Sequence, residues 1–336
     1  MPHSPQPAAK EDLCSAVDAF AGRRLLVWGD FVADRFLHGS TTRVSREAPA
    51  LVLRYEGEEV RPGGAGNAAL NAAALGAQVT ACGFVGADQA GEALLQALAT
   101  AGIDVEHITC RSDGATPVKT RVMAGGQHTV RQQILRIDDE TAWVHSAPSS
   151  MVAGTIGELA ADVDGVMISD YGLDTVCSAA AREWLAASPG VPVVLDSRHR
   201  LLEFTGVTAA TPNEGEAEEV VRHEFANDLS AVEAAGAQIT DRLGCDHLLI
   251  TRGSHGMAVF SHDRKPAHLP THGAHEIADV TGAGDTVIAS FTLGLAAGID
   301  VMRSAQVANV AAGLAVLKYG TATVTPAELL GALRDA

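Results

Sequence analysis

The segment that decides the fold is residues 277–298, IADVTGAGDTVIASFTLGLAAG, which is a short apolar run, a glycine turn and an uncharged helical pattern. Glycines directly before a helix permit a tight turn and leave the first helical amides unpaired. Together with the helix dipole, such amides form a site for an anion, most commonly a phosphate. We therefore predict a phosphate site at residues 281–285.

Asp285 follows these glycines directly. A carboxylate beside a phosphate repels it, so its presence here needs an explanation. It is explained if Asp285 takes a proton from a hydroxyl that attacks that phosphate. The alternative is that Gly282 and Gly284 only make a turn and that Asp285 caps the helix. Both interpretations stay open on this segment alone.

Composition and charge limit the classes of protein and of partner. The 336 residues are 47% hydrophobic and only 4% aromatic, with 34 glycines, which suits alternating strands and helices. The net charge of −17 argues against nucleic acid and membrane surfaces as partners but permits a small anionic substrate. The first residues lack the pattern of a signal peptide, and the five scattered cysteines form no Cys-x-x-Cys pair. We expect a cytoplasmic protein.

The order of elements predicts an α/β fold in a single domain, residues 1–336, with residues 1–10 disordered. A buried strand at 24–29 comes first, and strand–helix–strand patterns at 79–105 and 165–196 follow. Such units form right-handed crossovers in a parallel sheet. Segments 36–60 and 114–137 instead show the alternation of half-buried strands, and we predict that they form a small lid over the site.

Three further segments carry polar or glycine-rich patterns at predicted strand or helix ends. In 211–216, TPNEGE, Asn213 and Glu216 are three residues apart, which suits a hydrated Mg²⁺ or equally a capping box. The glycines of 251–256, TRGSHG, would let a nucleotide approach, with Arg252 stacking on it or pairing with it. The glycines of 61–77, RPGGAGNAALNAAALGA, open a helix that includes Asn67, although such turns often serve only close packing.

Two other features remain ambiguous or are discounted. The apolar helix at 305–317 could form a wall for a base or simply belong to the core. His268, His272 and His275 have ligand-like spacings but do not share one helical face, so we do not expect them to bind a metal.

Taken together, the segments at 61–77, 211–216, 251–256 and 279–286 (DVTGAGDT) resemble the ribokinase-like (PfkB) family of carbohydrate kinases. The resemblance covers residues 25 to about 330. It implies a three-layer α/β/α sandwich with a mostly parallel central sheet and a small β-sheet lid. It also implies ATP and Mg²⁺ as cofactors, and it raises a monovalent cation and a homodimer through the lid as further expectations.

Segments 29–36 (GDFVADRF), 42–53 (TRVSREAPALVL) and 307–329 look more specifically like heptose-7-phosphate kinases of the ADP-heptose pathway. This resemblance implies phosphorylation of D-glycero-D-manno-heptose 7-phosphate at the anomeric position. One alternative is a PfkB kinase for another sugar or sugar acid, such as ribose, fructose or ketodeoxygluconate. The other is a non-catalytic protein that binds a sugar or nucleotide on the same fold.

The resemblance also implies roles for individual residues. Asp285 would be the base, with amides from Gly282, Ala283 and Gly284 on the transferred phosphoryl group. Asn213 and Glu216 would hold Mg²⁺ through water. The residues expected near ATP are Thr251, Arg252, Gly253, Gly256, Ala308 and Ala312. Those expected on the sugar or its phosphate are Asp34, Gly63, Gly64, Asn67, Arg43, Glu47, Lys119 and Arg121.

Two short segments depart from the heptose kinase pattern. After Asp170–Tyr171 those kinases usually have a lysine and a glycine, where this chain has Gly172, Leu173 and Asp174. They also tend to have Asp-Pro-Lys at residues 196–198, where this chain has Asp-Ser-Arg. The loss of a lysine and the gain of Asp174 weaken the expectation of a phosphorylated sugar, but they leave the kinase expectation intact.

Overall fold

The computed structural model describes residues 10–125, 131–140, 143, 149–187, 189–273 and 278–335. The expectation for residues 1–10 lies outside this part of the chain except at Lys10, which begins a helix. His275 and residues 126–130 of the predicted lid segment 114–137 also lie outside the described residues.

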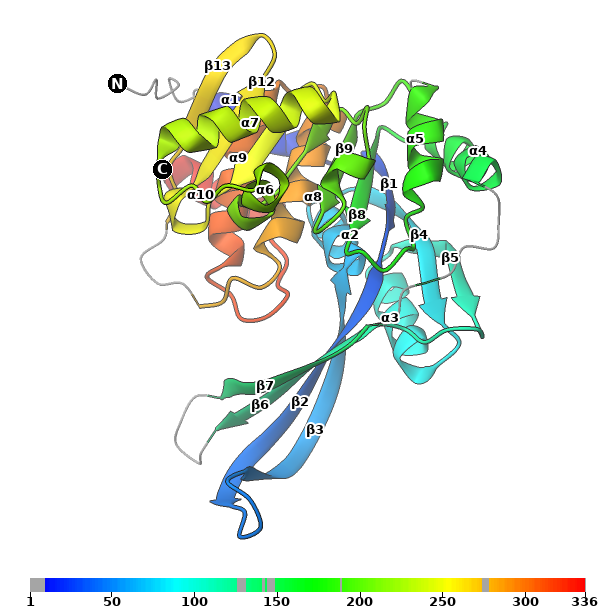
Figure 1. The fold of residues 1–336 in the computed structure, drawn as a ribbon, viewed down its shortest axis with the longest axis vertical. Helices are drawn as coiled ribbons and strands as arrows, with labels where there is room; N and C mark the ends of the chain where they lie inside the picture. The colour runs from blue at the N-terminus through cyan, green and yellow to red at the C-terminus, as the bar shows by residue number, and fades with distance from the viewer. Residues whose placement is uncertain are drawn as a thin grey trace.

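Within the described residues the main sheet has nine strands, parallel except for two antiparallel strands at one edge (Figure 1). In spatial order they are β13 (Arg264–Leu269), β12 (Met257–Ser261), β11 (His247–Thr251), β10 (Ala209–Ala210), β9 (Val193–Ser197), β8 (Gly165–Asp170), β1 (Arg24–Gly29), β4 (Gln78–Gly86) and β5 (Asp104–Arg111). The predicted parallel sheet is confirmed.

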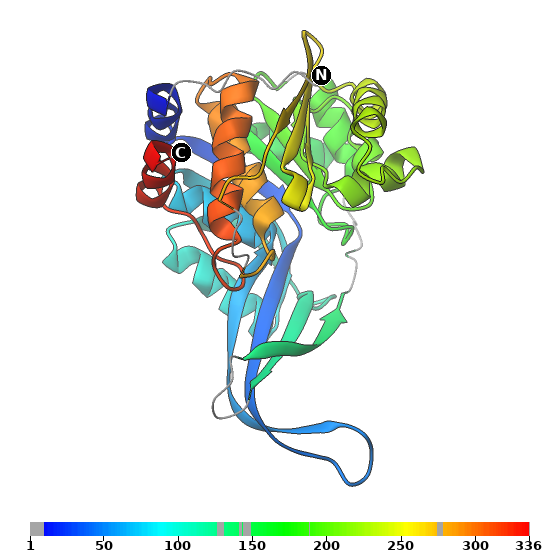
Figure 2. The same cartoon turned by 90° about the vertical axis from the view of Figure 1, so that its left-hand side faces the viewer.

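Helices cover both faces of this sheet, as the two sides of Figure 2 show. One layer comprises α1 (Lys10–Asp18), α2 (Ala65–Ala74), α3 (Gln89–Thr100), α8 (Ala283–Ala296), α9 (Val301–Ala315) and α10 (Pro326–Asp335). The other comprises α4 (Ser149–Ala160), α5 (Ser178–Ala186), α6 (Glu214–Val221) and α7 (Leu229–Leu243) with the short helix η1 (Leu201–Glu203); a second short helix, η2 (Gly253–His255), joins β11 to β12.

The sequence of β1 is a continuous hydrophobic run because a hydrophobic core lies on each face of the sheet. Leu25 and Val27 pack into the core beneath α2 and α8, whereas Leu26 and Trp28 pack into the core beneath α4 and α5. Successive side chains of a strand point to opposite faces, so a strand covered on both faces is apolar throughout. The predicted three-layer α/β/α sandwich is confirmed.

The lid is a separate four-stranded sheet that projects from the body (Figure 1). Its strands, in spatial order, are β3 (Leu51–Gly64), β2 (Phe31–Val44), β6 (Val118–Gly125) and β7 (Gln132–Asp139). The first lid strand begins at Phe31, earlier than predicted, because residues 31–34 are buried against the body and do not show the polar alternation of an exposed strand. Within the described residues, no helix has the length and apolar character needed to cross a membrane.

The helix pair α8–α9 packs too closely for a side chain at Gly294. A Cβ atom there would lie 2.4 Å from Ser304 Oγ and 2.7 Å from Ser304 Cβ. We predict that Gly294→Ala lowers the free energy of unfolding by about 1–3 kcal/mol, the usual cost of overpacking. Gly154→Ala is the matched control, because the space around Gly154 in α4 is open. It should be stabilising by up to about 1 kcal/mol. Urea unfolding measures both, and a Gly294→Ala variant as stable as the control would contradict this packing.

Candidate active site

Asp285 is the third residue of α8, which begins after the left-handed Gly282 (φ 80°). A Cβ atom at Gly282 would lie 2.5 Å from Asn67 Nδ2, so this position requires glycine. Within the described residues the amide of Gly284 has no hydrogen-bond partner, whereas the amide of Ala283 donates to the Val280 carbonyl at 3.3 Å. The predicted anion site therefore has a free amide at Gly284, but Ala283 is already engaged.

The carboxylate of Asp285 is buried and is held from two sides. Oδ2 accepts a hydrogen bond from Asn67 Nδ2 at 2.6 Å, and Oδ1 accepts one from the Tyr171 hydroxyl at 3.0 Å. Burial raises the pKa of Asp285 to about 6, although both hydrogen bonds oppose the shift. A carboxyl group with this pKa is ionised at neutral pH and still basic enough to accept a proton.

Tyr171 is placed by a buried carboxylate at the end of β1. Asp30 accepts hydrogen bonds from the backbone amides of Tyr171 (2.7 Å), Leu173 (3.1 Å) and Thr175 (3.0 Å). Burial and the nearby Asp170 raise the pKa of Asp30. The turn that follows β8 is thus fixed by the side chain that follows β1, its neighbour in the sheet.

A polar cavity of about 470 Å³ opens in front of Asp285. Its lining residues come from the carboxyl ends of β8, β9 and β11 and from the beginnings of α6 and α8. They are Asp170, Tyr171, Asp196, Arg198, Thr211, Asn213, Glu216, Thr251, Val280, Gly282, Gly284 and Asp285. The carboxyl ends of parallel strands are where open α/β sheets bind ligands.

Asn213 and Glu216 line this cavity and also form a capping box. Glu216 N donates to Asn213 Oδ1 at 3.0 Å, and Asn213 N donates to Glu216 Oε2 at 2.8 Å. The capping-box interpretation is therefore confirmed, and the magnesium interpretation stays a prediction for the same pair. Within the described residues no three acidic, histidine or cysteine groups converge as a metal cluster. The oxygen donors around this cavity, including Asp196, fit a Mg²⁺ ion that keeps several of its waters.

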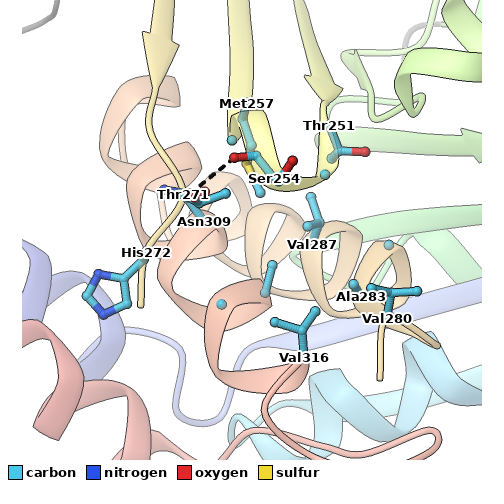
Figure 3. A pocket seen from close by; sticks show the side chains of 15 residues that line it. Thr251, Ser254, Met257, Thr271, His272, Val280, Ala283, Val287, Asn309 and Val316 are labelled. Atoms are coloured by element: carbon cyan, nitrogen blue, oxygen red, sulfur yellow. Dashed lines mark hydrogen bonds between the residues drawn. The ribbon is translucent and has the colours of Figure 1, made fainter. Parts of the chain in front are cut away.

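A second, mainly apolar cavity of about 170 Å³ adjoins the first and shares Thr251, Val280 and Gly284 with it (Figure 3). Its other lining residues are Gly253, Ser254, Gly256, Met257, Thr271, His272, Ala283, Val287, Asn309, Ala312, Gly313 and Val316. Gly256 has φ 82°, and a Cβ atom there would lie 1.9 Å from the Leu269 carbonyl oxygen. An apolar cavity that adjoins a polar one can accommodate a nucleoside triphosphate, with the base in the apolar part and the phosphates in the polar part.

Two of the residues predicted near the nucleotide do not line either cavity. The side chain of Arg252 is buried and faces Glu214, with Nη2 3.5 Å from Oε1. Ala308 is fully buried in the core. Val280, Val287 and Val316 line the apolar cavity although sequence reasoning did not select them, because isolated valines in loops and helices carry no distinguishing pattern.

Most of the predicted sugar-binding residues gather where the lid meets the body. Asp34 Oδ1 accepts a hydrogen bond from Arg121 at 2.5 Å, and Asp34 and Lys119 are cross-strand neighbours. Gly63 leaves room for Asp34, since a Cβ atom there would lie 2.7 Å from its carboxylate. A Cβ atom at Gly64 would in turn lie 2.6 Å from the Asp30 carbonyl oxygen and 3.4 Å from Tyr171 Cε2.

Arg43 and Glu47 lie elsewhere. Arg43 is at the far end of β2, Glu47 follows in the loop, and both are exposed. Neither residue lines the polar cavity, the apolar cavity or the cavity between the lid and the body. Sequence similarity could not show how far the long hairpin of β2 and β3 extends from the body of the protein (Figure 1).

A third cavity, of about 420 Å³, lies between the lid and the body. It is lined by Phe36, His38, Glu59, Arg61, Arg121, Met123, Arg131, Gln132, Gln133, Ala278, Asp279, Tyr319 and Gly320. The guanidinium groups of Arg61 and Arg121 lie 5.0 Å and 5.4 Å from the centre of the Phe36 ring. Arginines therefore converge on one side of a chain that is strongly acidic overall.

The departures from the heptose kinase pattern are accommodated locally. Asp174 adopts a left-handed backbone (φ 59°), and its side chain pairs with Arg200, which also pairs with Asp170. Leu173 is buried. The negative charge gained at Asp174 is thus paired and does not face the polar cavity, while Arg198 does line it.

Residues 24–328 match the family described as pfkB family carbohydrate kinases. The chain belongs to this family and is a carbohydrate kinase, a class that uses ATP and a divalent metal ion. It is 42% identical to the bifunctional protein HldE of Pelobacter propionicus, over 92% of this chain and 62% of that protein. It is 40% identical to HldE of Stutzerimonas stutzeri, over 92% of this chain and 63% of that protein.

The chain thus spans about three fifths of the length of these relatives. Solved structures agree on the fold. The ribokinase of Arabidopsis thaliana in complex with ribose and ATP superposes with a TM-score of 0.73 at 20% identity, covering 94% of this chain and 99% of that one. Phosphofructokinase-2 of Escherichia coli in complex with potassium superposes with a TM-score of 0.72 at 16% identity, with the same coverage. The predicted family and the ribokinase-like fold are confirmed.

The Asp30 carboxylate holds the turn after β8 in place, so its removal should lower the free energy of unfolding. Asp30→Ala would leave three backbone amides without their acceptors. We predict a loss of about 3 kcal/mol or more in the free energy of unfolding, measured by chemical denaturation. Asp18→Ala, at an exposed position of α1, is the control and should change little. A loss below about 1 kcal/mol in Asp30→Ala would show that the turn does not depend on this side chain.

Proposed function

We propose that this chain transfers the γ-phosphoryl group of ATP to the anomeric hydroxyl of D-glycero-D-manno-heptose 7-phosphate. The observation that carries the proposal is Asp285, a buried carboxylate with a pKa of about 6 beside a free helix-start amide and a polar cavity. The resemblance of segments 29–36, 42–53 and 307–329 to heptose-7-phosphate kinases supports this choice of acceptor.

In the proposed mechanism Asp285 accepts the proton of the acceptor hydroxyl. The oxygen then bonds to the γ-phosphorus while the bond from that phosphorus to the bridging oxygen breaks and ADP leaves. Asn213 and Glu216 would hold Mg²⁺ through its waters, and a bound Mg²⁺ would offset the charge of the phosphates. The Gly284 amide faces the transferred group, and the apolar cavity holds the base.

The lid cavity supports an acceptor that already carries a phosphate. Asp34, Gly63 and Asn67 lie at the body end of the lid, where the sugar hydroxyls would bind. Phe36 is two residues further along β2, or about 7 Å, which is roughly the length of one monosaccharide. A phosphate at that distance would meet Arg61 and Arg121, and guanidinium groups bind phosphate in a bidentate manner.

Several finer expectations belong to the same proposal. A monovalent cation is supported by the potassium bound to phosphofructokinase-2. A homodimer through the lid is supported by the exposed apolar residues Leu135 and Ile137 on β7. We also propose that residues 1–336 act as a single kinase domain in the cytoplasm. The alternative acceptors, ribose, fructose and ketodeoxygluconate, need no phosphate site on the lid.

Asp285→Asn tests the proposed base. Turnover should fall by about 10²- to 10⁴-fold, the usual effect of losing a general base, while ATP and acceptor binding persist. In the wild type, kcat/KM should decline as the pH falls through about 6, because protonated Asp285 cannot accept the proton. A coupled ADP-release assay over heptose, hexose and pentose phosphates and the free sugars measures both.

Near-normal turnover in Asp285→Asn would remove its role as the base. Activity only with unphosphorylated sugars would replace heptose 7-phosphate by another acceptor. If no sugar elicits ADP release, the non-catalytic alternative is favoured.

Arg61→Gln tests the lid phosphate site. We expect the KM for the phosphorylated acceptor to rise about 10-fold, because one charge-assisted contact is lost, with little change in the KM for ATP. Arg54→Gln is the matched control, since Arg54 is exposed on the same strand, β3, and does not line the cavity. Equal KM values in the two variants would place the acceptor phosphate elsewhere.

A further inference from the structure

Tyr171 has a place in the site that the proposed mechanism does not use. Its hydroxyl donates to Asp285 Oδ1 while Asn67 donates to Oδ2, so the two donors fix the plane of the carboxylate. Burial raises the pKa of Tyr171 well above its ordinary value, and Asp285 adds to the shift. The hydroxyl therefore keeps its proton and remains a donor at every working pH.

The ring of Tyr171 is held as firmly as its hydroxyl. Its backbone amide is bound to Asp30, and its Cε2 lies against Gly64, where a Cβ atom would approach to 3.4 Å. The ammonium group of Lys119, from the lid strand β6, lies 5.2 Å from the ring centre, within the range of a cation–π contact. The turn therefore presents the hydroxyl to Asp285 in one orientation and connects it to both the sheet and the lid.

We propose that Tyr171 is a positioning residue for Asp285, whose hydroxyl aims one carboxylate oxygen and stabilises the ionised form, held in place by Asp30. The inference rests on the proposed function only for its effect on catalysis. The hydrogen bond itself and its effect on Asp285 exist whether or not the chain phosphorylates a heptose.

The groups that face Asp285 make Tyr171→Phe a clean change. Asp34 and Lys119 act on Asp285 through charge, and Asp196 lies close enough to be affected by it. Asn67 and Tyr171 act as neutral donors. Replacing tyrosine by phenylalanine removes one donor and leaves every charge in place, so a shift in the pKa of Asp285 reports the lost hydrogen bond.

The test is a ¹³C NMR titration of the aspartate side-chain carboxyls in the full chain, with the Asp285 signal assigned by its loss in Asp285→Asn. The pKa of Asp285 should rise in Tyr171→Phe by about one unit, because a hydrogen bond to the charged form is lost. The acid limb of the pH profile of kcat/KM should move to higher pH by the same amount. At alkaline pH, kcat/KM of Tyr171→Phe should largely return to the wild-type value. A structural defect would not recover in this way.

Tyr55→Phe is the matched control, since Tyr55 is exposed on β3, and it should shift neither measurement. As a second route that spares the fold, fluorotyrosine acidifies the phenol and strengthens the donor, so it should lower the pKa of Asp285. Unchanged pKa values in both Tyr171→Phe and the fluorotyrosine protein would overturn the inference. An inactive wild type with the predicted NMR shifts would instead overturn only the proposed function.

Discussion

The burial of one carboxylate at the beginning of α8 is the constraint on which the site depends. An ionised Asp285 is costly to bury, and two donors reduce that cost by holding both of its oxygens. Asn67 comes from α2 in the same helical layer, and Tyr171 comes from the turn after β8 on the sheet between the layers. The orientation of the Asp285 carboxylate therefore depends on the relative position of α2 and the sheet edge, and not on α8 alone.

The parallel sheet makes this arrangement possible. The carboxyl ends of β1, β8, β9 and β11 meet at one edge, where they bring Asp30, Asp170, Asp196 and Thr251 together from distant parts of the sequence. Their roles then differ with their surroundings. Asp30 has three backbone donors and supports a turn, whereas Asp196 faces the cavity that would hold the metal and phosphates.

The sequence was sufficient to predict the sheet, the lid and the glycine turn at Asp285, because hydrophobic periodicity and glycine positions are local signals. It could not separate the two interpretations of Asn213 and Glu216, since a capping box and a metal-facing pair use the same spacing. Arg252 was misplaced because the direction of a side chain at a strand end depends on its tertiary partner, here Glu214. Helix α4 was not predicted because its sequence, SSMVAGTIGELA, contains two glycines, which disfavour a helix.

The central claim is that the acceptor hydroxyl meets Asp285 between the apolar cavity and the lid. A crystal structure with a non-hydrolysable ATP analogue, Mg²⁺ and heptose 7-phosphate tests it most directly. We predict the anomeric hydroxyl within about 3 Å of an Asp285 carboxylate oxygen, in line with the γ-phosphate. A hydroxyl bound next to a different base, with Asp285 still enclosed by Asn67 and Tyr171 and out of reach, would contradict the account.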